Sequence, residues 1–302
     1  MTLLTDYQHF AGRHWETGSL HNALAYQAAH APRPAQWGKP LSEAMLLGLS
    51  GGIAVGYFLF GYKGYPPQLA LMTRNTFSPF DTILERLGAP QTLLQTANPA
   101  KAEANLLEVL DSGRPALVWA DGLSLPYNGL GPAKDMWMMW PVVVYGYDGV
   151  TAWLADRSAQ PLQVTAAELA AARGRVKKEK YRVLALELPD RAKLPAAIDQ
   201  AMRQCIALYV DKPPRGTPDN FGLAALQHWA AMLTNTRNPK SWARFFPAGA
   251  GLWAAVIGAG WSPGLVGWIE GWGGPGADRG QYADFLDEAA ALTRRPGLKP
   301  AA

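Results

Sequence analysis

The spacing of apolar positions along the chain follows two patterns. Apolar residues repeated every three to four positions predict helices, and short apolar or alternating runs predict strands. The stretch over residues 12–24 runs as a loop into a first helix that stops before Ala31. A second helix is expected from near Pro40, with Ser42 and Glu43 in its first turn, up to Gly51. Capping signals predict helices that start at Ser78, Asn98 and Thr165. Runs of aliphatic and aromatic residues predict strands over 53–62, 68–73, 116–120, 141–147, 151–155 and 181–188.

The order of these elements predicts the fold class and the domains. Early helices followed by mostly antiparallel strands favour an α+β fold, and Asp148-Gly149 is a typical hairpin turn between two of the strands. The segment 189–195 reads as a linker, and only helical patterns follow it, over 195–209, 219–234, 239–246, 249–258 and 280–294. We therefore expect one domain over residues 1–188 and a helical domain over 189–302.

Composition excludes several classes of function. The chain has 302 residues and a net charge of +4, without a basic stripe interleaved with aromatics, so no nucleic-acid partner is expected. A single cysteine, Cys205, leaves no internal disulfide or CxxC-type zinc site and fits the cytoplasm. The first residues predict no secretory signal, and the apolar run near 250–261 is too short and glycine-rich to span a membrane. The glycines over 249–274 match no phosphate loop, so no cofactor is expected; Gly271–Gly276 reads as a turn.

The stretch over residues 12–24 holds the most suggestive chemistry. It places polar side chains at the start of the first helix, where open N–H groups and the positive end of the helix dipole suit a nucleophile or an anion. In the middle of these polar groups stands an indole, Trp15.

This stretch, the segment from Pro40 to Gly52 and the strand over 142–148 resemble a known family. They are similar to the N-terminal domain of butirosin biosynthesis protein H, an acyltransferase of the papain-like cysteine fold. Phe221-Gly222-Leu223, Trp242 and residues 279–290 resemble the helical domain that commonly follows it. The resemblance thus implies a papain-like domain followed by a helical one.

The resemblance also implies a mechanism that this chain has lost. Family members are expected to carry a cysteine at the start of the first helix, a histidine before the central strand and an aspartate after the next strand. This chain has Trp15 at the first position, Trp140 (or Met139) at the second and Asp156 at the third. Since an indole neither attacks a thioester nor takes up a proton near neutral pH, thiol catalysis is not expected here.

Several residues are candidates for a different chemistry. Ser19 or Thr17 could replace the nucleophile, although Thr17 equally suits a helix cap and Ser19 a position within the helix. His14 and Glu16 could transfer protons, with Asp156 in support, or could only bind backbone groups of the loop. The spacing of His14, Glu16 and His21 matches no standard metal motif, so no metal is predicted.

A substrate pocket is the other candidate. Trp15, Met138 and Trp140, with Met136, could line an apolar pocket for an aromatic or acyl ligand, or could fill the core. The same cleft could also be lined by Ser19 at the helix start and by two residues that follow a buried strand, Asp121 and Tyr127. These two residues could equally form an ordinary turn.

Two functions remain open on these grounds. The sequence favours a specialised-metabolite biosynthetic enzyme that acts without a thiol on an amino-acyl or aromatic small molecule, by condensation, cyclisation or acyl transfer. The alternative is a non-catalytic binding or scaffold protein of the same fold, a pseudoenzyme. The resemblance also implies an acyl carrier protein as a partner. The basic run over residues 173–182 would attract such an acidic protein, or it could simply be a solvated surface.

Overall fold

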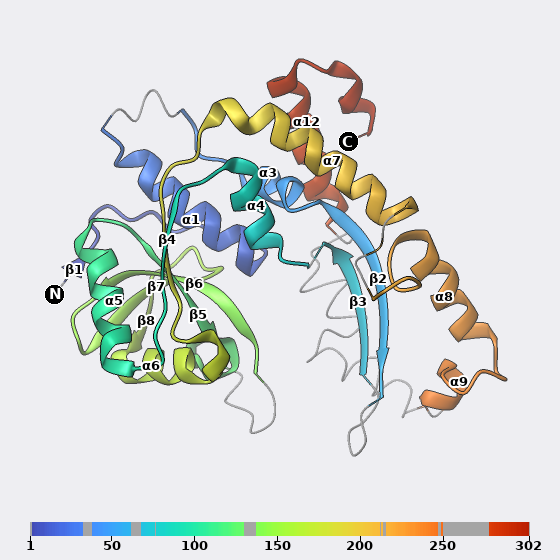
Figure 1. The fold of residues 1–302 in the computed structure, drawn as a ribbon, viewed down its shortest axis with the longest axis horizontal. Coiled ribbons are helices and arrows are strands. Elements are labelled where there is room, and N and C mark those ends of the chain that lie inside the picture. The colour runs from blue at the N-terminus through green and yellow to red at the C-terminus, as the bar shows by residue number, and fades with distance from the viewer. Residues whose placement is uncertain are drawn as a thin grey trace. The chain divides into compact units, whose positions relative to one another are not determined.

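The computed structural model describes residues 2–32, 38–61, 68–75, 77–129, 137–211, 213, 216–246, 249 and 278–301 (Figure 1). Residues 250–258 of one expected helix, the expected turn over 271–276, and Met136 lie outside the described residues. The chain forms two compact units, one of Met1–Leu46 with Leu87–Ala192, the other of Leu47–Arg86 with Lys193–Ala302.

An antiparallel sheet forms the centre of the first unit. Its strands are β1 (Thr2–Leu3), β4 (Gln91–Leu94), β5 (Ala116–Asp121), β6 (Met139–Tyr147), β7 (Thr151–Ala155), β8 (Leu162–Thr165) and β9 (Val183–Leu186). They follow the order β4-β9-β5-β6-β7-β8, and β1 pairs with the end of β6. Every residue of β5 is buried, as is β6 after its first residue, so these two strands form the core. The predicted hairpin between β6 and β7 is present, with Gly149 at φ 86°.

Three long helices of this unit pack with the sheet: α1 (Trp15–Ala29), α5 (Pro99–Asp111) and α6 (Ala166–Gly174). The Asn98 side chain accepts a hydrogen bond from the backbone N–H of Lys101, and Thr165 and Glu168 form the predicted capping box. The Ser19 hydroxyl of α1 donates to the carbonyl of Pro141 in β6 at 2.8 Å, which joins the helix to the central strand. Together with the sheet, these helices confirm the predicted α+β fold.

The second unit combines a small sheet with helices. Strands β2 (Ile53–Phe60) and β3 (Gln68–Arg74) pair antiparallel. The helices are α4 (Pro79–Leu87), α7 (Leu194–Val210), α8 (Gly222–Thr234), α9 (Trp242–Phe245) and α12 (Arg279–Thr293), and α3 (Glu43–Leu49) runs from the first unit into this one. Its core includes Tyr57, Leu71 and Trp242, and the Trp242 indole N–H donates to the Tyr57 hydroxyl at 2.8 Å. Cys205 is buried and donates to the carbonyl of Ile53, as suits a structural thiol.

The compact units differ from the domains expected from the sequence. The described regular structure after Leu194 is helical, as expected, but it forms one unit with residues 47–86, which precede the expected linker. Since compactness does not show which part folds alone, the domains 1–188 and 189–302 stay a prediction. None of the described helices combines the length and apolar character that a membrane-spanning helix needs.

Candidate functional site

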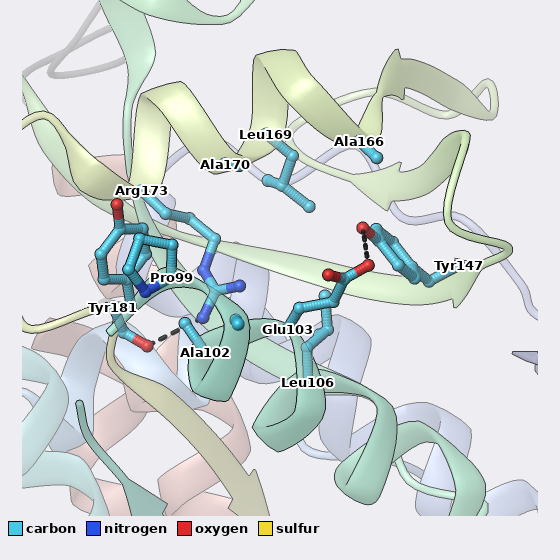
Figure 2. A pocket seen from close by; sticks show the side chains of 11 residues that line it. Pro99, Ala102, Glu103, Leu106, Tyr147, Ala166, Leu169, Ala170, Arg173 and Tyr181 are labelled. Carbon is cyan, nitrogen blue, oxygen red and sulfur yellow. Dashed lines mark hydrogen bonds between the residues drawn. The ribbon is translucent and has the colours of Figure 1, made fainter. Parts of the chain in front are cut away.

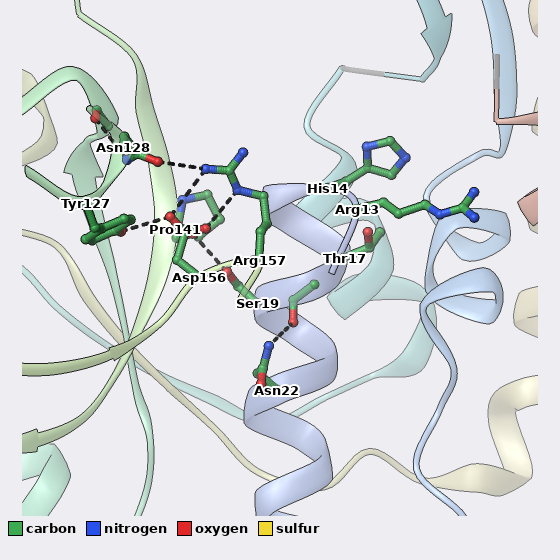
Figure 3. Close-up of polar contacts among 12 residues, drawn as sticks. Arg13, His14, Thr17, Ser19, Asn22, Tyr127, Asn128, Pro141, Asp156 and Arg157 are labelled. Carbon is green, nitrogen blue, oxygen red and sulfur yellow. Dashed lines mark hydrogen bonds and ion pairs between the residues drawn. The ribbon is translucent and has the colours of Figure 1, made fainter. Parts of the chain in front are cut away.

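The first helix begins around the carboxylate of Glu43. His14, labelled in Figure 3, is the N-cap residue, and its side chain makes no capping hydrogen bond. Instead the carboxylate of Glu43, the first residue of α3, accepts from the backbone N–H groups of Arg13 and His14 at 3.0 Å. It also accepts from the Thr17 hydroxyl at 2.8 Å. The anion-binding end of α1 is therefore occupied by a carboxylate of the chain itself.

Two glycines allow this arrangement. A Cβ added to Gly12 would lie 2.5 Å from the Cα of Gly18, a distance that real Cβ atoms do not reach. The loop before α1 can therefore lie against the first turn of the helix only because both positions lack side chains. The same Cβ position lies 3.4 Å from an oxygen of Glu43, so the close approach of the backbone also places the carboxylate.

The two indoles named from the sequence stack on each other. The ring centroids of Trp15 and Trp140 are 4.4 Å apart, with an angle of 9° between the ring planes. The guanidinium carbon of Arg157 lies 5.0 Å from the centroid of each ring, within cation–π range. We call Trp15, Trp140 and Arg157 the indole cluster. Trp140 is 4% exposed, whereas Trp15 is half-buried and thus partly open to solvent.

Asp156, at the end of β7, holds the cation of the indole cluster in place. One of its carboxylate oxygens accepts from Arg157 Nε at 2.9 Å, and the other accepts from the Tyr127 hydroxyl, also at 2.9 Å. Burial and the adjacent carboxylate raise the pKa of Tyr127 well above its ordinary value. Arg157 has φ 48°, in the left-handed region, and also donates to the side chain of Asn128. Both oxygens of Asp156 are thus engaged (Figure 3).

Asp121, at the end of β5, organises the turn beside the indole cluster. It is fully buried and accepts from the backbone N–H of Met138 at 2.7 Å and from the Ser124 hydroxyl at 2.6 Å. The Arg175 Nε lies 3.8 Å from the same carboxylate. These contacts fix the approach of the chain to β6. They fit a structural turn, which is one of the two roles that the sequence allows for Asp121.

The candidates for proton transfer lie apart from Asp156. The His14 side chain is buried on one side of the start of α1, and Asp156, Arg157 and Tyr127 lie on the other side (Figure 3). Glu16 is half-buried in the first turn of α1. The structure thus does not gather the three predicted catalytic groups around one point.

Three more polar side chains of α1 are held by contacts within the protein. Both Ser19 and Thr17 are buried, and their hydroxyls donate hydrogen bonds to Pro141 and Glu43. His21 contacts the carbonyl of Leu41 through Nδ1 at 2.7 Å, and burial lowers its pKa. Among the residues that the structure describes, no three His, Cys, Asp or Glu side chains form a group that could hold a metal ion.

The basic run over residues 173–182 is only partly a surface. Arg173 is buried, Arg175 lies near Asp121, and Arg182 lies over the Trp119 ring at 3.4 Å. Besides Arg175, which lies near the Asp121 carboxylate, the exposed cations of the run are Lys177, Lys178 and Lys180. Any attraction of an acidic partner would therefore depend on these three lysines.

With this geometry established, the chain can be compared with known proteins. Residues 14–157 match the family model described as butirosin biosynthesis protein H, N-terminal. This region is thus similar to that family. No curated protein matched the chain. The family suggests a papain-like fold for the first unit and a biosynthetic role of the butirosin type, as the resemblance implied.

The matched region contains most of the candidate site. It begins at His14 and ends at Arg157, so it includes the indole cluster, Asp121, Tyr127 and Asp156. Trp15 and Trp140 are neighbours in space, as the nucleophile and the base of a butirosin protein H-like domain would have to be. Whether they stand at the family's nucleophile and base positions stays a prediction, as do the roles assigned to the site residues.

Two residues of the site were missed by sequence reasoning. The sequence places Glu43 only in the first turn of its own helix. Its hydrogen bonds to the start of α1 leave no local signal in the sequence, apart from Gly12 and Gly18, which allow the close approach. Arg157 follows the predicted Asp156 directly, but its contact with both indoles depends on how β6 and β7 bring the chain together.

Proposed function

We propose that the chain is a butirosin-type biosynthetic protein that binds an aromatic or amino-acyl intermediate at the indole cluster without covalent thiol catalysis. The observation that carries this proposal is the stacked Trp15–Trp140 pair, because the Nε1–H of Trp140 is buried and has no acceptor within the described part of the chain. A buried N–H without an acceptor costs free energy. A ligand carbonyl oxygen would supply the acceptor, and the half-buried Trp15 would contact its apolar part.

The groups around the indole cluster support binding over catalysis. Both oxygens of Asp156 accept hydrogen bonds, so this carboxylate is not poised to orient a base. The pKa of Tyr127 is raised by burial, which disfavours its use as a base near neutral pH. An arginine stays charged and neither donates nor removes protons readily. The cluster thus offers contact surface and charge, but no nucleophile.

The start of α1 supports the same conclusion. In a thiol acyltransferase this helix end stabilises a thiolate and the developing negative charge on the substrate. Here Glu43 already takes the N–H groups of Arg13 and His14. A second negative charge at the same place would be repelled, so this helix end would not stabilise an anionic intermediate.

Catalysis by proton transfer is the second candidate. It is favoured by the position of His14 and Glu16, which both belong to the start of α1 next to the half-buried Trp15. Such an enzyme would carry out the condensation, cyclisation or acyl transfer expected from the sequence. In either case a carrier protein would be met through Lys177, Lys178 and Lys180, and the proposed location is the cytoplasm.

The phenylalanyl thioester of N-acetylcysteamine provides a probe for the two candidates. Calorimetric titration should show binding to the wild type, and the Trp15→Leu variant should bind about tenfold more weakly, as expected for one lost aromatic contact. The matched control is Trp137→Leu, since Trp137 is 55% exposed and precedes β6. Its affinity should stay within about twofold of the wild type.

The same samples separate binding from catalysis. Intact mass should show no acylated protein, and the thioester should not be consumed faster than in buffer. Equal affinity of wild type and Trp15→Leu, or no binding at all, would overturn the binding site. Consumption that is lost in His14→Ala and Glu16→Ala would overturn the non-catalytic role and establish proton transfer.

A further inference from the structure

A cavity of the first unit lies between α5, α6 and the end of β6 (Figure 2). Its volume is about 310 Å³, in the range of small-molecule sites. Leu106 of α5 and Leu169 of α6, both buried, form apolar walls. The cavity shares no lining residue with the indole cluster.

One end of this cavity holds a buried cation. Arg173 is 3% exposed and donates from Nη2 to the carbonyl of Tyr181 at 2.8 Å. Its Nε–H is buried and has no hydrogen-bond partner among the described residues. None of the ion pairs found in the described part of the chain includes Arg173. The Tyr181 ring lies 5.7 Å from its guanidinium carbon, but no carboxylate in the described ranges pairs with it. Burial lowers the pKa of Arg173 to about 10, and a buried charge without an ion-pair partner is costly.

The other end of the cavity is acidic. The Tyr147 hydroxyl donates to a carboxylate oxygen of Glu103 at 2.8 Å, and Figure 2 shows this pair facing the guanidinium of Arg173 across the cavity. Glu103 is exposed, so it marks the rim and not the floor. A ligand would therefore meet a cation at one end, aliphatic side chains along its length and a carboxylate at the other end.

We propose that this cavity binds a small monocarboxylate with a short apolar body. The carboxylate accepts hydrogen bonds from Arg173, in a charge-assisted pair that compensates the buried guanidinium. The apolar body packs against Leu106 and Leu169, and the far end carries no charge or a hydrogen-bond donor for Glu103. A phosphate is disfavoured because the cavity combines one cation with one carboxylate. The proposal is independent of the function assigned to the indole cluster.

Hexanoate is a suitable probe, with hexanamide as its uncharged analogue and inorganic phosphate as a small anion. Ligand-observed NMR titrations of the full chain should show that hexanoate binds at least about tenfold more tightly than either. Arg173→Gln should weaken hexanoate binding by about tenfold or more, as a charge-assisted hydrogen bond requires. Lys178→Gln removes the same charge from an exposed neighbouring position and should change the affinity less than about twofold.

A second variant keeps the test decisive if Arg173→Gln does not fold. Ala170 lines the cavity from an exposed position of α6, so Ala170→Phe should fill the cavity while leaving the buried cation in place. It should abolish hexanoate binding. Hexanoate binding that persists in Ala170→Phe, or equal affinity for hexanoate and hexanamide in the wild type, would overturn the proposal.

Discussion

Replacing Glu43 by glutamine should destabilise the first unit through the start of α1. The carboxylate accepts from the backbone N–H groups of Arg13 and His14 and from the Thr17 hydroxyl, at 2.8–3.0 Å. Glutamine keeps a neutral acceptor at Oε1, which receives all three donors, and turns its NH₂ group toward the Arg13 N–H alone. Hydrogen bonds to a charged group contribute about 1.5–3 kcal/mol and neutral ones about 0.5–1.5 kcal/mol, so each bond loses about 1 kcal/mol.

Summed over these contacts the loss is about 3 kcal/mol, to which the helix dipole adds up to about 1 kcal/mol. An amide is cheaper to bury than a carboxylate, and this offsets part of the loss. We therefore expect the free energy of unfolding to fall by about 2 kcal/mol. Thr17→Val, which removes one donor, should cost about 1 kcal/mol.

Urea unfolding followed by far-UV circular dichroism measures this change as a lower midpoint at an unchanged slope. Glu108→Gln provides the control, because Glu108 is exposed on α5 and the same chemical change should cost less than about 0.5 kcal/mol. In the double variant, the effects of Glu43→Gln and Thr17→Val should not add. A Glu43→Gln variant as stable as the control would refute the role of Glu43 at the helix start.

Three further variants test the packing around the indole cluster and around the cavity beside Arg173. Gly122→Ala would place a Cβ 1.7 Å from the Trp140 ring and should cost about 1–3 kcal/mol in urea unfolding, with partial recovery when Trp140→Phe is added. Asp156→Asn leaves the Arg157 cation beside the indoles without its carboxylate and should cost about 3 kcal/mol by the same assay. Burial and a hydrogen-bonded carboxylate raise the pKa of Tyr147 to about 12. Its ordinary value is about 10, so wild-type stability should fall between about pH 10 and 12, and Tyr147→Phe should flatten that fall.

Local signals in the sequence predict much of this fold. Asn98 and the Thr165–Glu168 pair cap their helices as expected, because capping depends on residues only a few positions apart. Strands β4 and β8 were not predicted. Both have only four residues. β4 is almost wholly exposed and shows no apolar alternation, and the alternation of Leu162 and Val164 in β8 is too short to indicate a strand. Their pairing with β9 and β7 depends on the folded sheet.

The candidate site was predicted in part for the same reason. Trp15, Trp140 and Asp156 were found because they stand near recognisable motifs. Glu43 was missed as a partner of α1, since only the close approach of Gly12 and Gly18 reveals how the loop meets the helix. Contacts between distant segments leave no periodic signal in the chain.

Trp15 and Trp140 are neighbours, and we predict that they stand at the nucleophile and base positions of butirosin protein H-like proteins. The pH dependence of iodoacetamide alkylation tests this prediction. It is measured in a Trp15→Cys variant and in a Trp15→Cys, Trp140→His double variant, both with the native Cys205 replaced by Ala. We expect the pKa of the introduced thiol to be at least about one unit lower in the double variant, because a nearby imidazolium stabilises the thiolate. The same pKa in both variants would contradict it.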